Sequence, residues 1–196
     1  MRNVEQQPGA SFQLRPFAQG VLGEKLSLGG SLSRTSAGLV IEYRLQGSLD
    51  GLNLSSMASI AQAGRRHELW QHTCFELFFA IPGKAAYWEL NLSPGGCWNV
   101  YHFAGYRTTV REERAIAQPL CQVVKEADLL SMACTLNIGT LLGGACQLDI
   151  GVAAVIETAD GRSSYWALDH PGPQPDFHDR RSFLLTLPGV TASSAV

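Results

Sequence analysis

Apolar and polar residues alternate along several stretches of the chain, and this period of two is the dominant pattern in the sequence. The segment LVIEYRL places four apolar residues on one face, namely Leu39, Ile41, Tyr43 and Leu45. The segments 129–138 (LLSMACTLNI) and 145–157 (ACQLDIGVAAVIE) repeat the alternation. Because successive side chains of a strand point to opposite faces, each segment is predicted to form a β-strand with one buried face.

Short turns rich in glycine and proline separate these runs and leave about ten or eleven candidate strands. Such turns occur at GG 29–30, PGK 82–84, SPGG 93–96, GG 143–144 and ADG 159–161. Helical patterns are limited to 56–63 and 111–117. Many short strands between frequent turns predict an all-β fold, an antiparallel sandwich or barrel. We expect one domain over residues 1–190 and a flexible tail over 191–196.

Composition and charge narrow the class of protein. Of the 196 residues, 45% are hydrophobic and 16% are charged, as is typical of a globular domain. The net charge is −2 without a basic block, so neither nucleic acid nor a membrane surface is expected as a partner. The oligomeric state stays open.

The cellular compartment is predicted from the N-terminus and the cysteines. The first residues lack the apolar core of a signal peptide, and no apolar run reaches the length of about 18 residues that a membrane span needs. The five cysteines are scattered and never form a CxxC pair. We therefore expect reduced thiols in a cytoplasmic protein, with neither a metal site nor a disulfide framework.

Residues 67–79, HELWQHTCFELFF, bring histidine, acid and cysteine together. A zinc-protease helix needs HExxH, but His72 comes one residue too late after His67. On a strand, Cys74 would lie roughly 7 Å from His72, too far for a base to activate it directly. No GxSxG elbow occurs either. We therefore predict a buried Cys74, no catalytic residue and no enzyme activity.

Two acids and an amide interrupt otherwise apolar strands. Glu76 lies in the middle of TCFELFFA, and Glu89 and Asn91 share one face of the next strand, YWELNLS. Buried acids must be paired or hydrogen-bonded, and Arg107 and Arg44 are the candidate partners. Two interpretations stay open: an internal salt-bridge band, or a band that reads the polar groups of a ligand.

The proline-rich loop HPGPQPDFHD, residues 170–179, carries four more polar side chains, His170, Asp176, His178 and Asp179. Clustered histidine and aspartate can form a metal site or an acid–base pair. The interpretation that we favour is a rigid loop in which Asp176 and His178 hydrogen-bond local backbone. If this loop lies beside the polar band, His178 becomes a ligand contact.

Three longer strings, LWQHTCFELFF, YWELNLSPGGCWNVYHFAGYR and YWALDHPGPQPDFHDRRSF, resemble the bacterial DOMON-like proteins. These are relatives of the family-nine carbohydrate-binding modules, and the similarity runs from about residue 66 to 187. The resemblance implies a single β-sandwich of two antiparallel sheets, an immunoglobulin-like or jelly-roll architecture. Family members include sugar binders, haem-binding cytochrome domains and proteins of unassigned role, so the resemblance indicates fold more than function.

In the sugar-binding relatives, two aromatic rings clamp a terminal sugar while polar groups on adjoining strands hydrogen-bond its hydroxyls. The resemblance implies that Trp70 is one clamp, and that Trp166, or else Phe177, is the other. It places the polar part of the pocket at Glu76, Glu89 and Asn91, and we expect Arg107 to belong to the same polar part. The family's sugar binders carry a basic residue where this chain has Glu89, a departure that concerns the identity of the ligand.

We therefore expect a non-catalytic domain that binds a saccharide or another small polar ligand and needs no cofactor. A haem-binding redox domain is the alternative within the same family, and it would need Met132 or Met57 opposite a histidine. An interaction module without a small ligand is the third hypothesis, in which the polar band is purely structural.

Overall fold

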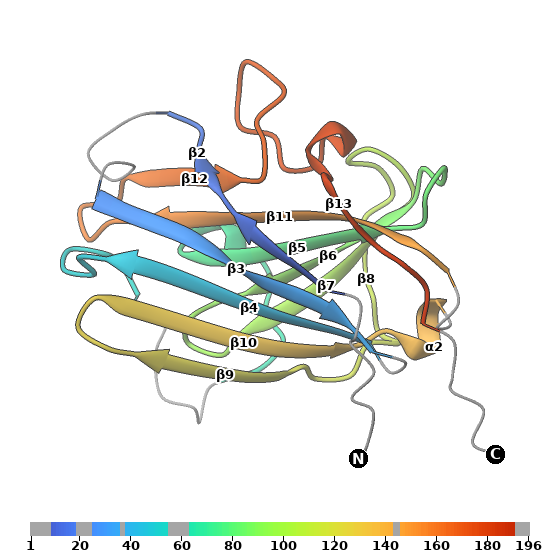
Figure 1. Ribbon diagram of the computed structural model, residues 1–196, viewed down its shortest axis with the longest axis horizontal. Helices are drawn as coiled ribbons and strands as arrows, with labels where there is room; N and C mark the ends of the chain where they lie inside the picture. Colours follow the sequence, from blue (N-terminus) through green and yellow to red (C-terminus); the bar gives the residue numbers. More distant parts are fainter. Residues whose placement is uncertain (1–8, 19–24, 36–37, 55–62, 143–145, 191–196) are drawn as a thin grey trace, which may run out of the picture.

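The computed structural model describes residues 9–18, 25–35, 38–54, 63–142 and 146–190. Within these ranges, thirteen strands form two antiparallel sheets that pack face to face as a β-sandwich (Figure 1). The all-β antiparallel sandwich predicted from the sequence is therefore confirmed. The predicted tail, 191–196, lies outside the described residues.

The first sheet has five strands, in the order β1-β3-β4-β10-β9. Their bounds are β1 Gly9–Gln13, β3 Leu26–Arg34, β4 Gly38–Gly47, β10 Leu129–Asn137 and β9 Leu120–Lys125. In the register of β4 and β10, Tyr43 lies opposite Met132. The alternating residues of LVIEYRL and LLSMACTLNI thus line up on one face, and this face is the buried one, as predicted.

The second sheet has eight strands, in the order β2-β12-β11-β5-β6-β7-β8, with β13 paired to β11. Their bounds are β2 Arg15–Pro16, β12 Ser163–Ala167, β11 Leu148–Glu157, β5 Cys74–Ala80, β6 Tyr87–Leu92, β7 Trp98–Phe103, β8 Arg111–Glu112 and β13 Leu185–Leu187. Strands β5, β6 and β7 follow one another as antiparallel neighbours. The polar residues of β5 and β6 are thereby brought side by side.

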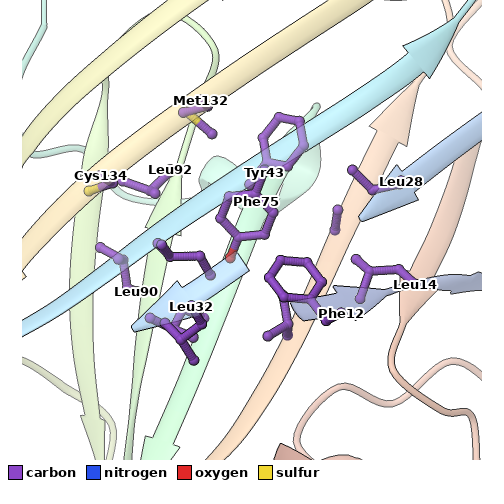
Figure 2. Close-up of a cluster of buried hydrophobic side chains, with 14 of the residues drawn as sticks. Phe12, Leu14, Leu28, Leu32, Tyr43, Phe75, Leu90, Leu92, Met132 and Cys134 are labelled. Carbon is purple, nitrogen blue, oxygen red and sulfur yellow. The ribbon is translucent and has the colours of Figure 1, made fainter. Parts of the chain in front are cut away.

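The core fills the space between the two sheets. Figure 2 shows side chains of the five-stranded sheet, such as Leu32, Tyr43 and Met132, beside Phe75, Leu90 and Leu92 of the eight-stranded sheet. The Tyr43 hydroxyl donates a 2.8 Å hydrogen bond across this core to the backbone carbonyl of Glu76. A buried hydroxyl needs such a partner, and this one ties β4 to β5.

The outer face of the eight-stranded sheet is covered as well. All seven residues of β5 are buried, which alternation alone does not explain. A second apolar cluster on this outer face includes Phe78, Tyr87, Phe103 and Phe183. Phe183 packs so closely on β11 that a Cβ built on Gly151 would lie 2.8 Å from its ring. The chain that leads to Phe183 therefore forms a partial third layer over the sheet.

Helical structure is scarce in the described residues. It comprises the short elements η2 Leu69–Gln71, α2 Gly139–Leu142 and η3 Arg180–Ser182, and none of these has the length and apolar character to cross a membrane. The helix predicted at 111–117 is wrong: residues 111–112 form β8 on the edge of β7, and Glu113 accepts hydrogen bonds from the Trp88 indole and the Ala115 amide. Most of the other predicted helix, 56–62, lies outside the described residues.

Candidate ligand-binding site

A cavity of about 410 Å³ opens on the outer face of the eight-stranded sheet. Its floor comes from five strands of that sheet, through Glu76, Glu89, Tyr101, Phe103, Val155 and Tyr165. Its walls come from η2 and two loops, through Trp70, Arg107, Val110, Pro175, Phe177 and His178. The volume is that of a small-molecule pocket, and the lining combines apolar rings with a few polar groups.

The two acids on the floor are set by strand alternation. Phe75 and Leu77 point into the core, so Glu76 between them points outward into the cavity. In the β5–β6 register, Glu76 pairs with Asn91, and Glu89 is its diagonal neighbour. Glu76 is 3% exposed and Glu89 is 4% exposed. Two carboxyl groups therefore lie on one sheet face, roughly 7 Å apart at the backbone, almost out of contact with solvent.

The two carboxyl groups have different partners. Oε1 of Glu89 accepts a 2.7 Å hydrogen bond from the amide of Asn91, and Oε2 lies 3.8 Å from Nε2 of His178. Asn91 is fully buried and also accepts a weak contact from the Cys74 thiol at 3.7 Å. Asn91 thus orients Glu89 and does not itself line the cavity. The Glu76 carboxyl makes no hydrogen bond or ion pair with any residue that the structure describes.

Burial and proximity change the ionisation of this pair. Burial raises the pKa of Glu89 to about 7, against the opposing effects of the Asn91 hydrogen bond and of Arg107. Burial, and then the charge of Glu89, raise the pKa of Glu76 well above its usual range, and Arg107 lowers it only in part. Each charge disfavours the other, so ionisation of one carboxyl group opposes ionisation of its neighbour.

Arg107 joins two loops at the wall of the cavity. Its guanidinium donates a 2.9 Å hydrogen bond to Oδ1 of Asp176, and its backbone amide donates to the Tyr87 hydroxyl at 3.2 Å. The second oxygen of Asp176 accepts from the Tyr106 hydroxyl at 2.5 Å. Arg44, the other predicted partner of the acids, lies on β4 in the opposite sheet beside Glu42, so that part of the prediction is wrong.

His178 is held as a neutral ring. Its Nδ1 lies 2.8 Å from the Tyr87 hydroxyl, and the rings of Phe78 and Phe103 pack against it edge-on. Burial, and then the charge of Arg107, lower the pKa of His178 to about 4. At neutral pH the imidazole is therefore a hydrogen-bonding group in the cavity and not a counter-ion for Glu89.

The loop that carries His178 shows half of the local bonding predicted for it: the Asp176 side chain bonds local backbone, whereas the His178 side chain meets Tyr87 on β6, so that part of the prediction is wrong. Asp176 accepts a 3.1 Å hydrogen bond from the backbone amide of His178, and Asp179 accepts one from Arg181 at 2.9 Å. His170 lies apart, 2.9 Å from the carbonyl of Arg15. Over the described ranges, no three histidine, cysteine or acidic side chains gather as metal ligands. The loop places His178 beside the polar band, as the ligand-contact interpretation requires.

Aromatic rings frame the cavity on two sides. Trp70 on η2 is 42% exposed and meets Tyr101 edge-on at a centroid distance of 5.8 Å. Across the cavity, Phe177 lies 6.2 Å from Tyr165 between ring centroids. Phe177, the second choice from the sequence, thus supplies the ring opposite Trp70.

The assignment of Trp166 to the ligand site is corrected by its position. Trp166 is 1% exposed and belongs to the core between the sheets, where its indole donates to the Ser164 hydroxyl at 2.9 Å. Its neighbour Tyr165 points to the other face of β12 and lines the cavity. Both residues are aromatic, so the alternation of SYWAL did not decide which of the two faced outward.

Backbone strain gathers at the rim of the cavity. Among the described residues, the non-glycine residues with positive φ are Glu68 (60°), Arg107 (52°) and Thr109 (49°). Glu68 directly precedes η2, which carries Trp70. Arg107 and Thr109 belong to the loop that contributes Arg107 and Val110 to the cavity wall. Left-handed backbone is unfavourable for residues with a Cβ and tends to occur at ligand sites.

The remaining candidates for chemistry lie elsewhere. Cys74 is fully buried on the same face of β5 as Glu76, and burial raises its pKa well above the usual range, so it is not a reactive thiolate. His72 is on the surface, 3.0 Å from Glu157. Met132 is buried in the core on β10 of the five-stranded sheet, whereas His178 lies in a loop over the outer face of the eight-stranded sheet. Met57 lies outside the described residues. The haem alternative therefore stays a prediction without a ligand pair in the described part of the chain.

Known structures share this fold. No family model and no curated protein matches the chain. A Bacteroides uniformis protein named for an inferred carbohydrate-binding role superposes with a TM-score of 0.61 at 9% identity, over 87% of this chain and 84% of that chain. A family 9 carbohydrate-binding module from Caldicellulosiruptor kristjanssonii, solved with glucose, gives 0.56 at 10% identity, over 95% and 87%. A family 9 module of the same organism with cellotriose gives 0.55 at 9% identity, over 95% and 86%.

The fold is similar to that of family 9 carbohydrate-binding modules. At 9–10% identity, this likeness concerns the course of the backbone and not the side chains of the site. What the cavity binds has to be argued from its own residues.

Proposed function

We propose that this chain is a non-catalytic, DOMON-like binding domain that takes a saccharide in the cavity over β5 and β6. The observation that carries the proposal is the pairing of aromatic walls with a polar floor in one concave site. Trp70 and Phe177 offer ring faces to the apolar C–H face of a pyranose, and the polar floor offers groups that hydrogen-bond hydroxyls.

The polar groups are suited to hydroxyl recognition because they are fixed before the ligand arrives. Asn91 orients Glu89, Tyr87 orients His178, and Asp176 orients Arg107. Side chains held by neighbours lose little conformational freedom on binding, so more of the contact energy appears as affinity. The likeness in fold to modules solved with glucose and cellotriose supports the same class of ligand.

The proposal assigns no catalytic step to the cavity. The pKa of His178 is lowered to about 4 and its ring hydrogen-bonds Tyr87, and the part of the lining that the structure describes contains no serine or cysteine nucleophile. The two carboxyls are held by the sheet and serve as hydrogen-bonding groups.

Tryptophan fluorescence and calorimetry test the proposal. Titration with a panel of mono- and disaccharides should change the emission of the exposed Trp70, with dissociation constants in the micromolar to millimolar range. Trp70→Ala and Phe177→Ala should each weaken binding at least about tenfold, as expected for loss of a stacking ring. Leu120→Ala is the matched control, because Leu120 is 78% exposed on β9 of the other sheet. If no sugar binds the wild type, the proposal is wrong.

A further inference from the structure

Acidic side chains outnumber cationic side chains in the lining of the cavity. The ionisable side chains of its lining include two carboxyls, Glu76 and Glu89, and one guanidinium, Arg107. The positive charge of Arg107 is already engaged by Asp176 at 2.9 Å. His178, whose Nε2 lies 3.8 Å from Oε2 of Glu89, is neutral at pH 7. Among the residues that the structure describes, the two acids of the floor therefore share one cationic neighbour, Arg107, and it is already paired with Asp176.

Of the two acids on the floor, Glu76 has fewer polar side-chain contacts with the described residues. Its side chain is 3% exposed and lines the cavity, yet within the described ranges nothing hydrogen-bonds its carboxyl. The Glu76 oxygens are not among the side-chain atoms sealed from solvent without a partner, so they open into the cavity. A carboxyl in so confined a space needs hydrogen bonds from water or from a ligand, and these reach it from the cavity because the other side of β5 is the packed core.

We propose that the cavity selects a sugar that carries a protonated amine, and that this ammonium is held between Glu76 and Glu89. This inference rests on the proposed saccharide function and specifies its ligand class. An ammonium has three N–H donors and one positive charge, so it can donate to both carboxylates at once. The diagonal placement of the two acids leaves room between them for such a group.

The walls favour an amine on a ring over a small free cation. A metal ion would need a cluster of ligands that the described residues do not provide, and it would leave the aromatic walls unused. A hexosamine uses both parts of the site: its ring stacks on Trp70 or Phe177, and its ammonium neutralises the floor. The exposed face of Trp70 also attracts a nearby cation.

Calorimetry with matched pairs of sugars tests the inference. Glucosamine, galactosamine and mannosamine are titrated at pH 7 beside glucose, galactose, mannose and the neutral N-acetyl forms. At least one amine should bind about tenfold more tightly than both its parent sugar and its N-acetyl form, as a charge-assisted contact in place of a neutral one implies. Glu76→Gln should reduce this preference to less than about threefold. Glu42→Gln, the same change on an exposed face of β4, should leave it unaltered.

The outcomes distinguish a failure of the amine preference from a failure of the saccharide function. If parent sugars bind the wild type as tightly as their amines, the amine preference is overturned and the saccharide function stands. If neither set binds, both are overturned. The wild-type ratio decides without any variant, so the test holds even if Glu76→Gln fails to fold.

Discussion

Glu76 and Glu89 face the same cavity from adjacent strands as diagonal neighbours, and both are almost fully buried. Among the residues that the structure describes, Glu89 has a close hydrogen-bond donor, the amide of Asn91, and Glu76 has none. An acidic pair in this environment makes the folded protein sensitive to pH, because burial holds protons on groups that lose them readily in the unfolded chain.

The first prediction concerns stability against pH. Folded Glu89 keeps its proton up to a pKa of about 7, whereas the ordinary pKa of glutamate is 4.5. The folded state therefore binds this proton more strongly. The contribution of Glu89 is most favourable below pH 4.5 and falls by about 3 kcal/mol as the pH rises to 7. The side chain introduced by Glu89→Gln cannot ionise. Urea titrations should therefore show that the free energy of unfolding of this variant rises relative to that of the wild type between pH 4.5 and pH 7.

His178 has the opposite effect on the pH dependence of stability, and it is present in both the wild type and Glu89→Gln. Its folded pKa of about 4 lies below the ordinary 6.5, so its contribution is lost as the pH falls from 6.5 to 4. The difference between Glu89→Gln and the wild type, and not the wild-type curve alone, is therefore the informative quantity. A difference that stays constant between pH 4.5 and 7 would contradict the account of Glu89.

The two tryptophans on either side of the sheet should behave in opposite ways. Trp166→Ala should lower the free energy of unfolding by about 3–5 kcal/mol, because it empties a fully buried site in the core. Trp70→Ala should cost less than about 1 kcal/mol, since its ring is 42% exposed. Urea denaturation of both variants measures this. Equal losses would mean that the two rings are not divided between core and cavity.

The hydrogen bond that crosses the core is the third test. Tyr43→Phe removes the donor to the backbone carbonyl of Glu76 and should lower the free energy of unfolding by about 1 kcal/mol. Tyr165→Phe is the control, since this ring is 40% exposed at the cavity and its loss of a hydroxyl should change stability little. A Tyr43→Phe variant as stable as the wild type would show that this contact does not hold β4 against β5.

The layer that covers the sheet is tested at Gly151. A methyl group there would meet the Phe183 ring at 2.8 Å, so Gly151→Ala should destabilise the protein by about 1–3 kcal/mol. Gly64→Ala is the matched control, because a Cβ at that position meets no atom of the described residues within 4 Å. Thermal or urea unfolding compares the two. If both variants unfold alike, Phe183 is not packed on β11 in solution.

Much of this architecture could be predicted from the sequence because alternation reports directly on burial. The buried faces of LVIEYRL and LLSMACTLNI were predicted correctly, and Glu76 and Glu89 share one sheet face as the alternation indicated. The register that makes Glu76 and Glu89 diagonal neighbours depends on how β5 and β6 pair, which the pattern of either strand alone does not contain.

The errors in predicting the site residues have a common physical cause. Tyr101 and Tyr165 line the cavity although their strands also carry aromatic residues on the core face, so hydrophobicity did not distinguish the two sides. Trp166 was assigned to the ligand for the same reason. The segment 111–117 reads as a helix locally, but the pairing of β8 with β7 and the contacts of Glu113 decide its conformation.

The location of the bound ligand tests the central claim most directly. Backbone amide shifts of isotope-labelled protein are recorded during titration with the sugar that binds most tightly in calorimetry. The account predicts that the largest changes cluster around Glu76, Glu89, Arg107 and Phe177. Changes centred on the five-stranded sheet, or no changes at saturating sugar, would contradict a saccharide site over β5 and β6.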